Sequence, residues 1–261
     1  GPLCVGMAMF HVEHWSPGDK APDLWSLLSG GVCREARDAR ARVAIDDSKK
    51  LKLSNQGTKH PLTHLERGVL AMMGSMVERP GSVEWYQADC QEEFPVAVPA
   101  ESIGIAANMV AGAMERAGVR LERLACRVVP EPVFNEVVRA AGTKAAATAL
   151  ALGECLTLVW EQYAGVGDEL AVRVMCDRQG GRTEYEEYLA EMVPGSVVKV
   201  LEQSARCGRY ELSGGGRSMV VLFQPEADGK HLPVALASMA AKLTRELLMA
   251  RFNRYWCARA P

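Results

Sequence analysis

Two short stretches of the sequence combine acids, hydroxyls and bases in a way that could do chemistry. The segment DDSKKL places Ser48, Lys49 and Lys50 directly after two acids, at the end of an expected strand. The segment CDRQGGR places Asp177 where a run of buried apolar residues stops, at the expected C-terminal end of another strand. Each stretch alone also has an ordinary explanation, because charged loops are usually solvated and an Asp before a helix often caps it.

A third stretch, PEADGKHLPVALASMAAKLTREL, places Asp228 in a loop just before a predicted helix. On that helix Ser238, Lys242 and Arg245 are spaced by four and three residues and therefore share one face, while apolar residues take another. Such a polar stripe could hold a phosphate backbone. The ordinary alternative is a loop acid followed by an amphipathic helix.

The elements that must position these residues alternate along the chain. Short apolar runs predict strands at 2–10, 41–47, 119–134, 169–177, 196–204, 209–213 and 218–223. Helical periodicity predicts helices at 22–30, 61–76, 99–118, 143–163, 182–193 and 234–252, of which 143–163 is the longest and is expected to pack centrally. The alternation predicts one α/β domain over 1–261, with a small β insertion at about 196–223.

Composition limits the classes of protein. The 261 residues are 48% hydrophobic and 24% charged, which is ordinary for a globular chain and argues against disorder. No apolar run is long enough to span a bilayer, and the first residues lack a basic leader, so we expect a cytoplasmic protein without a membrane partner. Eight scattered cysteines with no C-x-x-C pair fit a reducing compartment. With a net charge of −2, a nucleic-acid partner would have to be held by local basic clusters.

Taken together, the three stretches resemble the ribonuclease HII family. DDSKKL resembles the family's D-S-K-K-L motif, and Asp177 matches its third carboxylate. Asp228 lies fourteen residues before Lys242, which matches the family's fourth carboxylate and the lysine of its A-S-x-x-A-K-x-T-R pattern. GPLCVGMAMF resembles the strand that follows the family's catalytic motif. The resemblance implies a ribonuclease H-like mixed sheet flanked by helices.

The resemblance also implies a function, that of a metal-dependent endonuclease cutting the RNA strand of RNA–DNA hybrids or junctions. Two Mg²⁺ or Mn²⁺ ions would stabilise charge on the attacking and leaving oxygens, and such hard cations prefer oxygen ligands. Asp177 and Asp228 would be the catalytic metal ligands. The residues expected to bind substrate phosphate or sugar are Ser48, Lys49, Lys50, Ser238, Lys242 and Arg245.

Several features depart from the family pattern. Its first strand carries an Asp-Glu-Ala-Gly motif, so we expect two further carboxylates upstream of Gly1, and we expect its substrate-positioning tyrosine beyond the last residue. Glu246 stands where the family has Asp, and the β insertion is longer, which indicates a divergent branch. Residues 1–261 expressed alone are therefore predicted to fold loosely and to lack Mg²⁺-dependent nuclease activity.

Two other functions remain open. One is a nuclease of the same fold that acts on branched or damaged DNA, and the other is a catalytically silent nucleic-acid-binding module. Two further patterns are set aside. His60 and His64 are four residues apart, but Pro61 places His60 outside the helix, and SGGGRS lies between strands, where a hairpin turn is expected.

Overall fold

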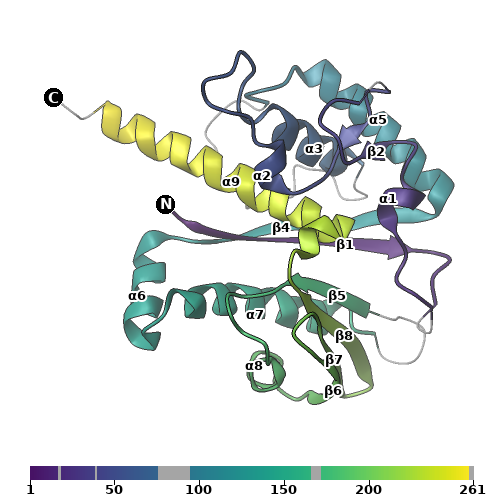
Figure 1. Ribbon diagram of the computed structural model, residues 1–261, viewed down its shortest axis with the longest axis vertical. Helices are drawn as coiled ribbons and strands as arrows, with labels where there is room; N and C mark the ends of the chain where they lie inside the picture. Colours follow the sequence, from purple (N-terminus) through teal and green to yellow (C-terminus); the bar gives the residue numbers. More distant parts are fainter. Residues whose placement is uncertain (17–18, 39, 76–94, 166–171, 259–261) are drawn as a thin grey trace.

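The computed structural model of the protein describes residues 1–16, 19–38, 40–75, 95–165 and 172–258. Its helices are α1 (Leu24–Leu27), α2 (Ser48–Leu51), α3 (Thr63–Gly74), α5 (Ala100–Ala117), α6 (Glu131–Ala141), α7 (Lys144–Gln162), α8 (Glu186–Met192), the 3₁₀ turn η2 (Ala227–Gly229) and α9 (Leu232–Cys257). Its strands are β1 (Leu3–Val12), β2 (Val32–Cys33), β3 (Val43–Ala44), β4 (Val119–Val129), β5 (Val172–Asp177), β6 (Val197–Gln203), β7 (Gly208–Gly214) and β8 (Arg217–Gln224). Figure 1 shows helices on both sides of the strands, so the predicted α/β fold class is confirmed.

The strands form a mixed four-stranded sheet and two smaller pairs. In the larger sheet, in the order β5-β8-β7-β6, β5 and β8 are parallel, while β7 is antiparallel to both its neighbours. The long strands β1 and β4 pair antiparallel along their length, and β2 and β3 make a short parallel pair. Gly214 pairs with Arg217 across a two-residue turn, which confirms the predicted hairpin.

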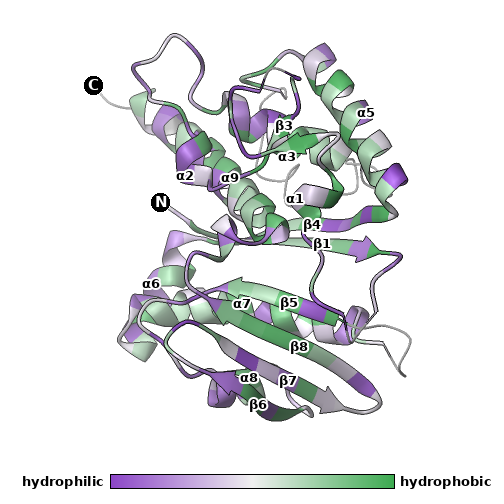
Figure 2. Ribbon diagram, turned by 45° about the vertical axis from the view of Figure 1, so that its right-hand side comes forward, coloured by the Kyte–Doolittle hydropathy of each residue, from purple (hydrophilic) through white to green (hydrophobic). Residues whose placement is uncertain are grey.

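Two hydrophobic cores lie on either side of the β1–β4 pair. One gathers buried side chains from α3, α5, β4 and α9, and the other gathers those from α7, α8 and the four-stranded sheet. Met7 and Met9 of β1 pack against the second core, so β1 contributes to both. Figure 2 shows hydrophobic residues concentrated along β5, β8 and α7, where the second core lies.

Helix α9 packs closely on β1. A Cβ atom added to Gly6 would overlap the carbonyl oxygen of Ala237, so only glycine allows this approach. The predicted apolar face of the helix is confirmed, since Met239, Leu243 and Leu247 are all buried. This contact fixes where α9 presents its polar residues.

Three predictions about the elements are wrong. The predicted strand 119–134 ends at Val129, and α6 follows with Pro132 in its first turn, where the missing N–H has no helical partner to lose. The longest helix is α9 rather than 143–163. The predicted strand 41–47 is reduced to the two residues of β3.

The predicted β insertion is part of the larger sheet. Strand β8 pairs with β5 along the full length of β5, so β6, β7 and β8 continue the sheet that ends in Asp177. Residues 169–171 of the predicted strand 169–177 lie outside the described residues. In the part of the chain that the structure describes, no helix is both long and apolar enough to cross a membrane.

Candidate active site

Asp177 ends β5 and faces solvent, as a C-terminal strand residue of a parallel pair often does. It pairs in register with Gln224, the last residue of β8, so the two parallel strands end at the same level. The Oδ1 atom of Asp177 accepts a hydrogen bond of 3.2 Å from the backbone N–H of Ala227. This bond ties the end of β5 to the turn that carries the second predicted carboxylate.

That second carboxylate, Asp228, lies in η2 and is half-buried. Burial raises the pKa of its carboxyl above the usual value, and the negative charges of Asp47 and Asp177 raise this pKa further. A backbone hydrogen bond from Gly229 and the positive charge of Lys49 act in the opposite direction. Asp177 and Asp228 are therefore brought together, as the sequence predicted, and a third acid joins them.

The third acid, Asp47, was not predicted as a site residue. Its side chain caps α2 by accepting a 2.8 Å hydrogen bond from the backbone N–H of Lys49. The signal was present in DDSKKL, where an acid directly precedes a short helix. What the sequence could not show is that this cap lies beside a turn that follows β8.

Asp46, the neighbouring acid, is buried and partly unpaired. Its Oδ2 atom lies 3.4 Å from the Nζ atom of Lys50, and its Oδ1 atom has no hydrogen-bond partner. A buried carboxylate oxygen without a donor is costly and therefore unusual. Lys50 therefore contacts Asp46 through this ion pair, although its side chain remains 64% exposed.

The two predicted serines meet between α2 and α9. The Oγ atoms of Ser48 and Ser238 lie 3.0 Å apart and share a hydrogen bond. Ser48 is buried and Ser238 is half-buried. This contact brings together the DDSKKL segment and the polar stripe of α9.

The basic residues of the predicted stripe differ in their surroundings. Lys242 makes an ion pair of 3.0 Å with Glu246, which also binds Lys52 at 2.9 Å, so α2 and α9 are joined by a Lys–Glu–Lys bridge. Arg245 and Lys49 are exposed. Lys50 is exposed as well but is paired with Asp46, so Lys49 and Arg245 are the predicted bases best placed to meet a ligand from solution.

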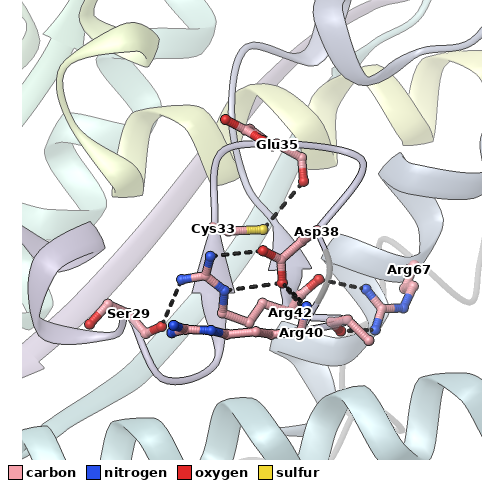
Figure 3. A network of polar contacts seen from close by, with 8 residues as sticks. Ser29, Cys33, Glu35, Asp38, Arg40, Arg42 and Arg67 are labelled. Atoms are coloured by element: carbon pink, nitrogen blue, oxygen red, sulfur yellow. Dashed lines mark hydrogen bonds and ion pairs between the residues drawn. The ribbon is translucent and has the colours of Figure 1, made fainter.

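The loop that leads to DDSKKL is held by a separate ion-pair network, shown in Figure 3. The carboxylate of Asp38 accepts hydrogen bonds from the guanidinium and the backbone N–H of Arg42, which lower the pKa of Asp38 well below its usual range. Arg67 of α3 donates to the backbone oxygens of Ala41 and Arg42. The network fixes β3, and through it the position of Asp46 and the following residues.

A second link runs from this loop to the acidic turn. The Nη1 atom of Arg34 donates a 2.9 Å hydrogen bond to the carbonyl oxygen of Gly229, and its guanidinium stacks 3.6 Å from the centre of the Trp25 ring. The sequence did not single out Arg34, because the contact joins segments far apart in the chain.

The donor set matches the chemistry of a hard divalent cation, since Asp47, Asp177 and Asp228 supply only carboxylate oxygens. Within the described ranges, however, no group of three or more His, Cys, Asp or Glu side chains converges closely enough to hold a metal ion. The three acids interact through their charges without meeting at one point.

His60 lies before α3, as Pro61 predicted, and its Nδ1 atom accepts a hydrogen bond from the backbone N–H of Leu62.

No protein-family model, curated protein or solved structure matches this chain.

Proposed function

We propose that this protein is a metal-dependent endonuclease of the ribonuclease HII type, which hydrolyses the RNA strand of RNA–DNA hybrids or junctions. The observation that carries the proposal is that Asp177, Asp228 and Asp47, from three segments far apart in the sequence, lie close enough for the charges of Asp177 and Asp47 to act on Asp228, as does that of Lys49. Burial opposes the ionisation of Asp228, and so does repulsion by Asp47 and Asp177, which a divalent cation would relieve.

Each residue then has a defined task. Asp177 and Asp228 would hold the metal ions, with Asp47 beside them, and bound Mg²⁺ or Mn²⁺ would supply charge stabilisation for phosphodiester hydrolysis. Lys49 and Arg245, both exposed, would contact backbone phosphates, which positions substrate without reading its sequence. The bridge of Lys242 and Lys52 through Glu246 would hold α9 at a fixed distance from α2.

The strand pairing agrees with the resemblance on one further point. A ribonuclease H-like sheet would carry its first two carboxylates on a central strand. Within the described residues β1 pairs only with β4 and β5 pairs only with β8, so each keeps an edge to which such a strand could hydrogen-bond. Helix α9 packs against both β1 and β5 and so spans the two sheets.

Cleavage of a panel of labelled substrates tests the proposal. RNA–DNA hybrid, duplex RNA, duplex DNA and branched DNA would each be incubated with the full-length protein and Mg²⁺ or Mn²⁺. We expect cleavage of the RNA strand of the hybrid alone, and none with a chelator. Cleavage confined to branched DNA would favour the second nuclease function, and metal-independent binding with no cleavage of any substrate would favour the silent binding module.

A further inference from the structure

The C-terminal half of α9 carries two exposed aromatic side chains. Phe252 and Trp256 are 50% and 55% exposed, and their spacing of four residues places them on one helix face. Their ring centroids are 6.1 Å apart and their planes are inclined by 57°. Figure 1 shows this end of α9 extending past α2, away from the sheets. Neighbouring large rings on a projecting helix are typical of a binding surface.

The charge of the same helix segment indicates the kind of partner. Between residues 242 and 256 the helix carries four basic residues and one acid, a formal charge of +3, whereas the whole chain carries −2. The basic residues are Lys242, Arg245, Arg251 and Arg254. These residues are distributed around the helix rather than along one face. A local excess of positive charge on a nearly neutral protein favours an anionic polymer as the partner.

We propose that Phe252 and Trp256 form a stacking platform for a single-stranded segment of nucleic acid. Bases stack on aromatic rings whatever their sequence, and the positive charge of the same helix segment favours the phosphates that join the bases. Bases inside a duplex are already stacked on each other, so they cannot reach these rings. The platform therefore selects a single-stranded extension that leaves the duplex held near Asp177 and Asp228. The choice of nucleic acid as the anionic polymer rests on the proposed function.

The length of α9 sets where that extension must begin. At about 1.5 Å per residue, the helix advances about 17 Å from Arg245 to Trp256. A duplex strand advances about 3.4 Å per nucleotide, so this length corresponds to about five base steps. The single-stranded segment should therefore start within about five base pairs of the phosphates that Lys49 and Arg245 contact.

Fluorescence anisotropy with two labelled RNA–DNA hybrids tests the platform without any need for cleavage. Both hybrids have the same duplex, and one adds a single-stranded extension of about ten nucleotides, within the known range of site sizes. Binding is measured with a chelator present. Phe252→Ala and Trp256→Ala should each weaken binding to the extended hybrid by about 5- to 100-fold and leave the blunt hybrid unaffected. Ile105→Ala, which trims another exposed apolar side chain, on α5, should change neither.

Three results would overturn the platform. Unchanged affinity of both aromatic variants for the extended hybrid would show that the rings do not bind bases. An equal loss of affinity for the blunt hybrid would show that they have no preference for single strands. If sedimentation showed a dimer that the variant no longer forms, with no change in its affinity for the extended hybrid per protomer, the rings would instead contact a second copy of the protein. The outcome is separable from the proposed function, because a protein that fails to cleave hybrid can still show the predicted affinity difference, and an active nuclease can lack it.

Discussion

Asp228 differs from the neighbouring acids because its ionisation is opposed by burial and by the negative charges of Asp47 and Asp177. Asp38 represents the opposite case, since hydrogen bonds from Arg42 favour its charged form. Acids whose ionisation is opposed, such as Asp228, are found where a protein gathers charge for a ligand. Acids whose charged form is favoured by hydrogen bonds, such as Asp38, hold a loop together. The two acids therefore predict opposite effects on stability.

Replacing Asp228 by Asn should stabilise the metal-free protein at neutral pH. The pKa of Asp228 is raised in the folded state above its unfolded value of about 3.9, so ionisation of this group favours unfolding. The ionised carboxylate destabilises the folded protein increasingly as the pH rises from the unfolded-state pKa to the folded-state pKa. The full destabilisation persists at higher pH. Thermal melts with a chelator should show a higher Tm for Asp228→Asn at pH 7, and the charge-dependent part of this gain should vanish below about pH 3.9.

Asp38→Asn serves as the control with the opposite sign. Its folded-state pKa is lowered by Arg42, so the charged form stabilises the fold at neutral pH, and this contribution is lost as the pH falls through the folded pKa. We therefore expect a lower Tm for Asp38→Asn at pH 7. A lower Tm for Asp228→Asn as well would contradict the electrostatic account of the acidic turn.

The exposed bases should act through phosphate contacts. Replacing Lys49 or Arg245 by Gln should weaken binding to duplexes of different sequence by similar factors. Each should also reduce the slope of log K against log salt by nearly one, about 0.9 per contact in a duplex. Lys199→Gln, at an exposed position on β6, should leave the slope unchanged. Slopes equal to that of the original protein for Lys49→Gln and Arg245→Gln would make these residues ordinary solvated bases.

At the scale of elements, the position of α9 decides whether the site is assembled. Its N-terminal half packs against β1 at Gly6, and its polar face meets α2 through the hydrogen bond between Ser48 and Ser238. Helix α2 is a single turn whose Asp47 cap lies beside Asp228. A shift of α9 relative to β1 would therefore move the acidic turn, which directly precedes this helix.

Gly6→Ala should be strongly destabilising for this reason. The added Cβ would overlap the backbone oxygen of Ala237, and neither β1 nor α9 can relieve the clash by a side-chain movement. Such overpacking costs about 1–3 kcal/mol or more, which urea unfolding would measure. Gly104→Ala is the matched control, because a Cβ there meets nothing within 4 Å and the residue lies inside α5. It should stabilise by roughly 0.5–1 kcal/mol.

Most elements could be predicted from the sequence because hydrophobic periodicity and glycine positions determine them locally. Helix α5 ends at Ala117, one residue from the predicted end, and Gly118 follows it in a left-handed conformation. Helix α6 was missed because its first residues, with Pro132, were included in the predicted strand 119–134, although proline is tolerated in a first helical turn. The Lys242–Glu246 pair could have been predicted from its spacing of four residues, which would have identified Arg245 as the more available base.

At the scale of the whole molecule, the site depends on contacts that no local pattern reveals. Asp177 and Asp228 meet because β5 and β8 are parallel and end together, and this pairing required recognising β6, β7 and β8 as part of one sheet. Asp47 and Arg34 join them from the other core, across the β1–β4 pair. The predicted carboxylates are thus brought together as expected, whereas their closest partners could only be found in three dimensions. That residues 1–261 alone fold loosely stays a prediction.

Cleavage of labelled RNA–DNA hybrid by Asp177→Asn and Asp228→Asn variants of the full-length protein, with hybrid affinity measured in parallel, tests the central claim most directly. Glu202→Gln, a matched loss of an exposed carboxylate on β6, serves as the control. If the two acids hold the catalytic metal ions, each Asn variant should lose metal-dependent cleavage by at least about a hundredfold while hybrid affinity changes little, because the phosphate contacts lie on other residues. Turnover near that of the original protein in either variant would contradict the assignment of that carboxylate.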